Sequence, residues 1–466
     1  MRQTVLRLLV FSILAAGVVQ AAEPGEQRAR GWVEAFNSGD DETLDRYAAA
    51  HLTPEALNRR EPAIRRASYR AMFERHGKLE IVSAAVDNGI LLLQAKPERG
   101  DPVTVRFRIE PSAPHRIEGV AIVPRRAPGA PALPPLTLPG KTSGEVKKVL
   151  DPYLAWLAAQ DSFAGTVAVA RNGVILFEAA YGLASRRYDV PHKTSTRINL
   201  GSITKELTQV AIAQLADAGK LDLDVPIVKY LPQYPNQEVA KKVTIRQLLT
   251  HTSGLGDIYT ERFNAVSKLD FDTVQRFIDF FAPDPLQFEP GTREKYSNYG
   301  FAVLGAVVEA VSGERYYDYI HKHVLRAAGM ETSGFFDLLE ITPDLAMGHT
   351  KAMSDAGPVW LENTLLRYNT IGFPGGGSYS TAREMVLFDR AVRTAKLTSA
   401  KSAAWILRHD ARTDGAFTAL RSVAGGSVGV NAQLSGDGIW TVAVLANMDP
   451  PIAQDLGDAI FEALRR

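Results

Sequence analysis

The sequence of 466 residues predicts an α+β protein made of two folded units, and three observations lead to this prediction. A proline-rich stretch at residues 124–139 divides the chain, because such a composition favours an extended linker over a packed core. Before this stretch, helical patterns are followed by strand patterns, and after it strand patterns stand at both ends with helical patterns between them. We therefore expect a small domain at 22–123, a linker at 124–143 and a larger domain at 144–466.

The smaller unit begins with helical spacing and continues with period-two alternation. The helical patterns cover residues 28–36, 42–50 and 62–75. The alternation predicts four strands, at residues 79–86, 90–96, 103–109 and 117–123. This order, together with the helix end AFNSGD, resembles that of the cone-shaped NTF2-like domains over about 100 residues.

The larger unit opens with two strand patterns, at 164–170 and 174–181, and the Asn-Gly pair between them is typical of a tight hairpin. Helical patterns follow at residues 205–218, 244–250, 299–311, 316–328 and 382–391. Strand patterns return at 427–434 and 439–445, and a helical pattern at 452–464 closes the chain. The order predicts a sheet built from both ends of the domain around a helical insertion.

The first 21 residues have the layout of a secretory signal peptide, with Arg2 and Arg7 before an apolar run at 8–19 and small residues after it. We therefore expect a periplasmic or secreted protein. A membrane anchor is the alternative, but this run is well short of the roughly 20 residues of a spanning helix. No later stretch is long and apolar enough to span, so we expect no stable membrane span.

Composition excludes several kinds of site and partner. The chain has no cysteine, which removes disulfides, a cysteine nucleophile and thiolate metal ligands. It carries 53 Lys and Arg against 52 Asp and Glu, and such a near-neutral balance argues against nucleic acid as a partner. His321 and His323 are two apart on a predicted helix and face different ways, so we expect neither a metal nor another cofactor.

Ser202 and Lys205 stand three residues apart at the predicted start of a helix, a spacing that places a hydroxyl and an amine on one face. A buried lysine with a lowered pKa can take the proton of the serine, and the helix N-terminus favours the alkoxide that results. The pair alone is a weak signal, because a chain of this length contains about one such pair by chance. The alternative is a helix start with an exposed lysine.

A Tyr-x-Asn motif about ninety residues later strengthens the signal. Tyr296 is a phenol that can shuttle protons, and the amide of Asn298 can orient a carbonyl. A helix start capped by a polar side chain is the alternative for this motif. A second motif of this kind, Tyr234 and Asn236, lies in a loop between prolines, and we interpret it as part of the loop.

Several sequence blocks, in this order along the chain, resemble those of the β-lactamase-related serine hydrolases, over about residues 144–466. The blocks are FAGTVAVARNG, INLGSITKELTQVAIAQLADAGKLDLDVPIVKYLPQYP, VTIRQLLTHTSGL, FEPGTREKYSNYGFAVLGAVVEAVSG, GGGSYSTAREMVLF and VGVNAQL with TVAVLANMDP. This family includes class C β-lactamases, D-alanyl-D-alanine carboxypeptidases, D-aminopeptidases and some esterases. The resemblance implies an antiparallel sheet flanked by helices, with an all-helical lobe closing over the cleft.

The resemblance also implies roles for individual residues. Ser202 is expected to be the acylated nucleophile, Lys205 its base partner, Tyr296 the proton relay, and Asn298 a contact for Lys205 and the substrate. The backbone N–H groups of Ser202 and Gly426 are expected to bind the developing oxyanion. His251 in the LLTHTSGL block is a candidate for the site, although a hydrogen-bonded loop histidine is the favoured interpretation.

The third family motif departs from its usual form. Aligned through its glycines, the chain has Val423-Ala424-Gly425 where the family usually has Lys-Thr-Gly or His-x-Gly. The missing cation or imidazole normally binds a substrate carboxylate, so we expect weaker recognition of peptides and β-lactams than of simple esters. Arg421 has the same strand parity as Val423, and one hypothesis is that its longer side chain reaches the site instead.

Two functions remain open from the sequence. The first is an exported serine hydrolase that cleaves an amide, ester or lactam carbonyl through an acyl-enzyme on Ser202, and a D-amino-acid peptidase is one form of it. The second is a catalytically weak or inactive protein that binds cell-wall peptides or β-lactams. Either way, the expected partner is a small-molecule or peptide substrate, and the sequence determines neither the substrate nor the oligomeric state.

Overall fold

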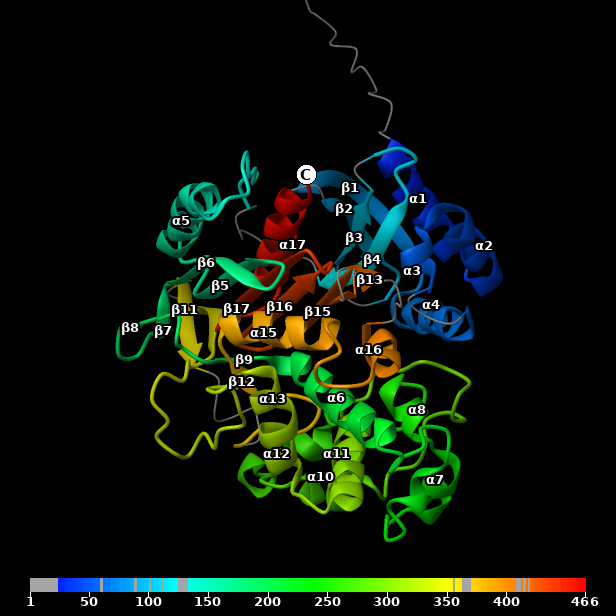
Figure 1. The fold of residues 1–466 in the computed structure, drawn as a ribbon. Coiled ribbons are helices and arrows are strands. Elements are labelled where there is room, and N and C mark those ends of the chain that lie inside the picture. The colour runs from blue at the N-terminus through cyan, green and yellow to red at the C-terminus, as the bar shows by residue number, and fades with distance from the viewer. Residues whose placement is uncertain are drawn as a thin grey trace, which may run out of the picture.

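The computed structural model shows a small N-terminal unit resting against a larger body that is made of a sheet layer and a helical lobe (Figure 1). It describes residues 24–58, 62–87, 90–99, 102–110, 112–124, 133–354, 357–362, 370–407, 412–413, 416–417 and 420–466. The predicted signal peptide at 1–21 and residues 125–132 of the linker lie outside these ranges. Within them, no helix combines the length and the hydropathy needed to cross a membrane.

The N-terminal unit contains the helices and the four-stranded antiparallel sheet that the sequence predicts. Its elements are α1 (Pro24–Asn37), α2 (Asp41–His51), α3 (Pro54–Asn58), α4 (Pro62–His76), β1 (Leu79–Asp87), β2 (Ile90–Pro97), β3 (Val103–Ile109) and β4 (Ile117–Pro124), with the strands in the order β1-β2-β3-β4. Trp32 of α1 packs against Phe107 of β3 at the centre of its core. The likeness of this unit to NTF2-like domains stays a prediction.

The larger unit is built on a five-stranded antiparallel sheet whose strands come from both ends of the domain, as predicted. In spatial order these strands are β15 (Arg421–Ser427), β16 (Val430–Gly436), β17 (Trp440–Ala446), β5 (Gly165–Arg171) and β6 (Val174–Tyr181). One predicted strand, at 427–434, is confirmed only over 430–434, where it belongs to β16. The stretch 427–434 contains the turn between β15 and β16, where Gly429 has a φ of +71°, so the run is split between two strands.

Alternating residues of β5 separate the two faces of this sheet. Val167 and Val169 pack in one core with helices α5 (Ser143–Ala159) and α17 (Ile452–Arg465). Ala168 and Ala170 belong to the core on the opposite face, which includes α15 (Ala382–Arg393). Side chains alternate across a strand, so small alanines allow the close approach of that second layer.

The helical lobe lies on the alanine side of the sheet, below it in Figure 1. Its first helix, α6 (Thr204–Asp217), is buried along most of its length and packs against α11 (Asn298–Ser312). The remaining helices in the described part of the larger unit are α7 (Gln237–Lys242), α8 (Ile245–Leu249), α9 (Glu261–Asn264), α10 (Val274–Phe281), α12 (Tyr316–Tyr319), α13 (Arg326–Ala328) and α16 (Ala400–Leu407), with the short turns η1 (Gly201–Ile203), η2 (Ile227–Lys229), η3 (Lys268–Asp270) and η4 (Ile320–Leu325).

The described part of the larger unit also has short strands outside the five-stranded sheet. They are β7 (Leu183–Ser185), β8 (Val190–Pro191), β9 (Ile198–Asn199), β10 (His349–Ser354), β11 (Gly357–Glu362), β12 (Tyr379–Ser380), β13 (Arg412–Thr413) and β14 (Ala416–Phe417). The pairing of β9 with β12 places the segment before Ser202 beside the glycine-rich segment at 375–377.

The described end of the linker differs from the extended spacer that its composition predicts. Leu133, Leu136 and Leu138 are at most 6% exposed and belong to the same core as α5 and α17. The carbonyl of Pro134 accepts a hydrogen bond from Tyr153 of α5 at 2.9 Å. Leucines spaced between the prolines anchor this segment to the larger unit, because their burial outweighs the preference of the prolines for an open chain.

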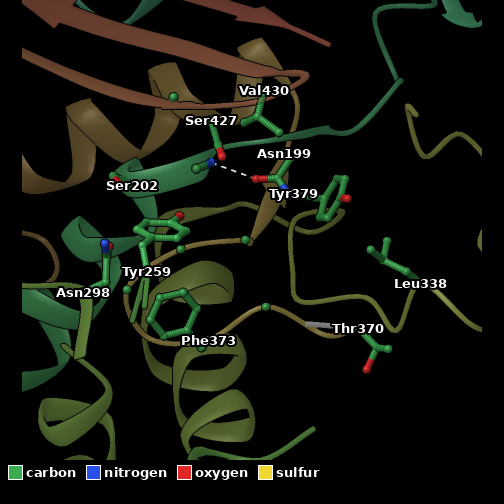
Figure 2. Close-up of a pocket in the computed structure, with 16 residues that line it drawn as sticks. Asn199, Ser202, Tyr259, Asn298, Leu338, Thr370, Phe373, Tyr379, Ser427 and Val430 are labelled. Carbon is green, nitrogen blue, oxygen red and sulfur yellow. Dashed lines mark hydrogen bonds between the residues drawn. The ribbon is translucent and has the colours of Figure 1, made fainter. Parts of the chain in front are cut away.

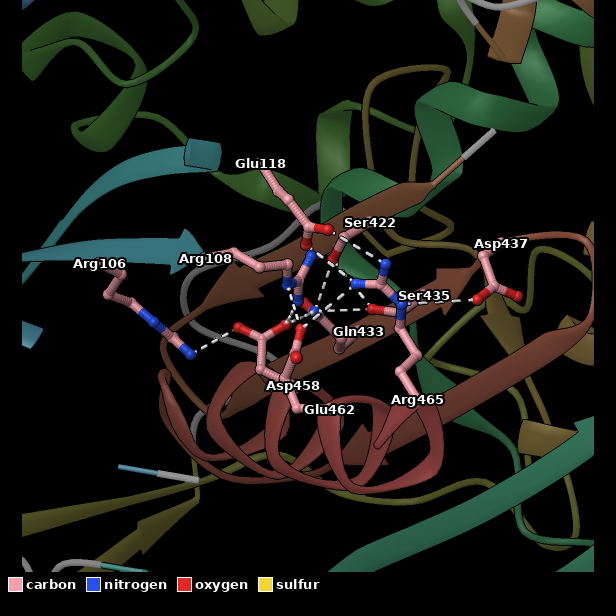
Figure 3. A network of polar contacts seen from close by, with 10 residues as sticks. All are labelled: Arg106, Arg108, Glu118, Ser422, Gln433, Ser435, Asp437, Asp458, Glu462 and Arg465. Atoms are coloured by element: carbon pink, nitrogen blue, oxygen red, sulfur yellow. Dashed lines mark hydrogen bonds and ion pairs between the residues drawn. The ribbon is translucent and has the colours of Figure 1, made fainter. Parts of the chain in front are cut away.

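A charged network joins the N-terminal unit to the C-terminal helix α17 (Figure 3). Arg106 and Arg108 of β3 reach Asp458 of α17, each at 2.6 Å. Asp458 also accepts a hydrogen bond at 3.0 Å from Gln433 of β16, so the network continues into the central sheet. These contacts hold the two units together through charges that are mostly removed from water.

Candidate active site

Ser202 lies in the turn η1 that opens helix α6, between the sheet and the helical lobe. Asn199 supports this turn, because its Oδ1 accepts a hydrogen bond from the N–H of Gly201 at 2.8 Å. Gly201 has a φ of +52°, and a Cβ at this position would lie 3.0 Å from the backbone nitrogen of Gly426. The N–H of Ser202 is one of the donors that a helix start leaves without an acceptor inside the helix.

Lys205 lies at the start of α6, three residues after Ser202, and is only 5% exposed. Its Nζ lies 3.3 Å from Ser202 Oγ and 2.7 Å from Asn298 Oδ1, and it also hydrogen-bonds to the carbonyl of Gly375. A neutral amine has two N–H groups and one lone pair. The two carbonyl oxygens can only accept hydrogen bonds, so they engage both N–H groups and leave the lone pair facing Ser202.

Burial lowers the pKa of Lys205 from its ordinary value to about 7, while the charge of Asp257 opposes this shift. The amine is therefore largely uncharged just above neutral pH, which is the form that can accept the proton of a serine. The geometry and the pKa thus favour the same role for this residue.

Tyr296 stands two residues before α11, and its hydroxyl donates a hydrogen bond to Ser202 Oγ at 2.7 Å. The Nζ of Lys205 lies 4.7 Å from the centre of the tyrosine ring. Although the side chain is 46% exposed, desolvation around its oxygen raises the pKa above the ordinary value, and the hydrogen bond with Ser202 opposes the shift. The phenol therefore keeps its proton at neutral pH and is available as a donor.

Asn298 is the first residue of α11, whose start is capped by the side chain of Ser297. Its Oδ1 accepts from Lys205, and its Nδ2 donates to Asp257 at 2.9 Å. The structure thus brings together all four side chains that the sequence singles out, as one hydrogen-bonded set. A capped helix start and a catalytic motif are therefore not exclusive alternatives here.

Gly425 allows the strand β15 to lie against the turn that carries Ser202. A Cβ on Gly425 would lie 1.9 Å from the carbonyl oxygen of Leu200 and 2.9 Å from the nitrogen of Ser202. The same approach brings the nitrogen of Gly426 next to the turn, as its contact with Gly201 shows. The N–H groups of Ser202 and Gly426 therefore lie on adjoining segments, the arrangement of an oxyanion hole.

The cleft around Ser202 is small and has no ionised side chain among its described lining residues (Figure 2). It encloses about 50 Å³, room for only a few water molecules. Tyr259 of the helical lobe hydrogen-bonds to Ser427 at the end of β15, and both residues line the cleft. The lining consists of Asn199, Gly201, Ser202, Tyr259, Asn298, Leu338, Thr370, Gly372, Phe373, Gly375, Gly376, Gly377, Tyr379, Gly426, Ser427 and Val430.

The third motif places no cation in this lining. Val423 is half-buried, lies opposite Leu434 of β16 and packs against the core on the lobe side of the sheet. Arg421 forms an ion pair with Glu206 of α6 and lies outside the lining of the cleft. The hypothesis that Arg421 replaces the missing cation is therefore not supported by its position.

The other polar candidates have structural positions. Tyr234 is buried and hydrogen-bonds to Tyr299 at 2.7 Å, and Asn236 caps α7, as expected for loop residues. His251 accepts a hydrogen bond from the N–H of Ser297 at 3.2 Å, and its ring lies 4.5 Å from that of Tyr296. It therefore supports the phenol from behind. In the described part of the chain, no group of acidic or histidine side chains could hold a metal ion.

Sequence reasoning missed three groups at the site. The carbonyl of Gly375 carries no side-chain signal, since any residue has such a group. Asp257 and Tyr259 follow the LLTHTSGL block directly, and two polar residues so close to a motif are a signal that was available. Their contacts become visible only when the loop between α8 and α9 is placed against α11 and β15.

Comparison with known proteins agrees with this geometry. A family model described as "Beta-lactamase" matches residues 146–464. The penicillin-binding protein of Bacillus halodurans has a solved structure with a TM-score of 0.58 and 30% identity, which covers 66% of this chain and 99% of its own.

Among curated proteins, the putative penicillin-binding protein PbpX of Bacillus subtilis is 32% identical over 240 residues, covering 52% of this chain and 57% of its own length. Esterase EstB of Burkholderia gladioli is 37% identical over 185 residues, covering 37% of this chain and 47% of its own length. The chain thus spans about half the length of the curated relatives that it matches. Since the family model covers more than half of the chain, the chain belongs to the β-lactamase family of serine hydrolases.

Proposed function

We propose that the protein is an exported serine hydrolase that forms an acyl-enzyme on Ser202 and acts preferentially on uncharged esters. One observation carries the proposal. Ser202 Oγ accepts a hydrogen bond from Tyr296 and lies 3.3 Å from Nζ of Lys205, whose two N–H groups are engaged by two carbonyl oxygens, so its lone pair faces the serine. A binding protein without turnover has no need for this arrangement.

The arrangement supports a two-step reaction. Neutral Lys205 takes the proton of Ser202 while Oγ attacks the substrate carbonyl, and the N–H groups of Ser202 and Gly426 stabilise the oxyanion. Tyr296 donates its proton to the leaving alcohol as the C–O bond breaks, and the proton held by Lys205 restores the phenol. In the second step, water loses a proton to the same pair and attacks the acyl carbonyl, which releases an acid and regenerates Ser202.

The preference for uncharged substrates follows from the lining of the cleft. No described lining residue is ionised, and Val423 stands where the family usually has a cation. A substrate carboxylate would lose its water shell without gaining a charged partner, and that loss is costly. The similarity to an esterase supports the same choice. Cell-wall peptides with a terminal carboxylate are therefore poorer candidates than esters.

A pair of matched substrates tests this proposal. 4-Nitrophenyl butyrate and mono-4-nitrophenyl glutarate share a leaving group and differ chiefly in the terminal carboxylate. We expect kcat/KM for the neutral ester to be higher by roughly tenfold or more, the worth of one charge-assisted contact. Equal turnover of both esters, or faster turnover of the charged one, would contradict the preference. Absence of turnover beyond that of a Ser202→Ala variant would contradict the hydrolase itself.

Export rests on the layout of residues 1–21, with two arginines before an apolar run. Expression of the full chain in a Gram-negative host, followed by fractionation and N-terminal sequencing, tests it. We expect a mature periplasmic protein that begins close to Ala22. An unprocessed chain in the cytoplasm would contradict the proposal.

A further inference from the structure

Asp257 lies beside the catalytic set without lining the cleft. It belongs to the loop between α8 and α9, and its Oδ1 accepts three hydrogen bonds. The donors are the N–H of Ile258 at 2.7 Å, the N–H of Asn298 at 3.1 Å and the side-chain Nδ2 of Asn298 at 2.9 Å. One carboxylate oxygen therefore holds both the backbone and the side chain at the start of α11.

These contacts decide which way the amide of Asn298 points. An ionised carboxylate can only accept hydrogen bonds, so the NH₂ group of Asn298 must face Asp257. The amide oxygen is then turned toward Nζ of Lys205, at 2.7 Å. In the reversed orientation an NH₂ group would face the amine and would compete with its N–H groups. Asp257 thus fixes one of the two acceptors that aim the lone pair of Lys205 at Ser202.

Asp257 is also the charge that acts on Lys205. Burial favours the neutral amine, and the carboxylate of Asp257 opposes it. Glu206 is paired with Arg421, so its charge is matched locally. The other titratable groups around the site are two tyrosines and one histidine. Tyr296 is bonded to Ser202, Tyr259 lines the cleft, and the ring of His251 packs behind the phenol of Tyr296.

We propose that Asp257 is a positioning residue for acylation, which orients the amide of Asn298 and supplies the negative charge that balances the buried amine of Lys205. The inference rests on the proposed function, because it concerns how the same base is prepared. The loop between α8 and α9, which carries Asp257, would then help to set the pH range of the reaction.

Three variants separate the charge of Asp257 from its shape. Asp257→Asn keeps an oxygen acceptor and loses the charge, so the amine loses its proton more easily and the acid limb of activity moves to lower pH. We expect a shift of roughly one pH unit. Asp257→Glu keeps the charge but moves the carboxylate oxygen from its position beside Asn298. The acid limb of activity is therefore expected to stay at the wild-type pH, while the activity on the alkaline plateau falls. Asp257→Ala loses both, and we expect a plateau about 10- to 100-fold lower together with the shifted limb.

The experiment measures the rate constant of labelling by a fluorophosphonate between pH 5 and 10, alongside kcat/KM for 4-nitrophenyl butyrate. The labelling rate constant does not depend on the fraction of the sample that is folded, so it remains measurable for a poorly folding variant. Asp284→Asn is the matched control, because Asp284 is a carboxylate of the same lobe that pairs with Arg262 away from the site. We expect its acid limb to coincide with that of the wild type.

The outcomes are distinct. A downward shift in Asp257→Asn and Asp257→Ala, absent from Asp257→Glu and Asp284→Asn, supports the inference. An unshifted limb in Asp257→Asn overturns it, even if the plateau falls, because lost activity alone would reflect a structural role. A wild-type protein that is neither labelled at Ser202 nor active on the ester would overturn the proposed function and the inference with it.

Discussion

The protonation state of Lys205 controls the nucleophile at the scale of single residues. Burial penalises its ammonium form, while two carbonyl oxygens accept hydrogen bonds from both N–H groups of the neutral amine. Tyr296 is affected in the opposite sense, because desolvation makes its proton harder to lose. The two groups therefore remain base and acid over a common range of pH.

This pairing predicts the pH profile of the wild type. The pKa of Lys205 is lowered to about 7, and the base is active only when neutral, so kcat/KM is expected to rise as pH increases through about 7. The raised pKa of Tyr296 keeps the acid protonated, so the plateau is expected to extend beyond pH 9. Steady-state hydrolysis of 4-nitrophenyl butyrate across this range measures the profile. A rise near pH 10 would mean that the pKa of Lys205 is not lowered, and would contradict this account of how the base is prepared.

Among single residues, sequence reasoning was strongest for the side chains that carry chemistry. Ser202, Lys205, Tyr296 and Asn298 have recognisable spacing, and the structure brings them within hydrogen-bond reach of each other. Asp257 was missed because its effect depends on a loop folding back onto a distant helix start. That contact has no periodicity and no fixed spacing along the chain.

At the scale of elements, the close contact between β15 and the turn η1 assembles the site. It depends on Gly425 and Gly201, because a side chain on either would meet backbone atoms of the other segment. The sequence identified the glycines but misplaced the strand at 427–434, since a run of apolar residues does not reveal where a tight turn interrupts it. The hairpin at Asn172 and Gly173 was found because its turn residues are distinctive.

Substitution of Gly425 tests the importance of this contact. Gly425→Ala places a methyl group 1.9 Å from the carbonyl oxygen of Leu200, so the strand must move away from the turn. We expect kcat/KM to fall about 100-fold or more, because the two N–H donors no longer converge. Gly144→Ala is the control, since nothing lies within 4 Å of a Cβ at that helical position. Equal activity of both variants would show that the oxyanion is bound elsewhere.

The whole molecule is held together by the charged network between β3 of the N-terminal unit and α17 (Figure 3). Arg108 pairs with Asp458 at 2.6 Å and with Glu462 at 2.8 Å, and these three side chains are 12%, 13% and 6% exposed. Burial raises the pKa of Glu462, and Arg108 opposes that shift. Removal of one partner from a buried ion pair leaves an uncompensated charge away from water, which destabilises the protein. The stability of each of these charges therefore depends on the presence of the others.

Removal of one partner therefore has a large expected cost. Arg108→Leu removes the cation that joins Asp458 and Glu462 of α17 to β3, and we expect the free energy of unfolding to fall by about 3 kcal/mol or more. Arg262→Leu is the matched control, because its pair with Asp284 has side chains that are 47% and 41% exposed. That variant is expected to cost less than about 1 kcal/mol. Chemical denaturation measures both, and equal losses would mean that the network contributes little to docking.

This interface could not be predicted from the sequence, although both units could. Charged residues on a strand and on a terminal helix are usually solvated faces, and their pairing across some 350 positions leaves no local pattern. The leucines at 133, 136 and 138 pose a similar problem, because the proline content around them points to an open linker. Long-range packing decides both cases.

The central claim is that Ser202 is a nucleophile activated by Lys205, and covalent labelling tests it most directly. The wild-type protein is treated with a fluorophosphonate at pH 8, and the modified residue is identified by intact mass and peptide mapping. The account predicts a single adduct on Ser202, no adduct in Ser202→Ala, and labelling at least about 100-fold slower in Lys205→Ala. A folded wild-type protein that remains unlabelled, or is labelled at another residue, would contradict the claim.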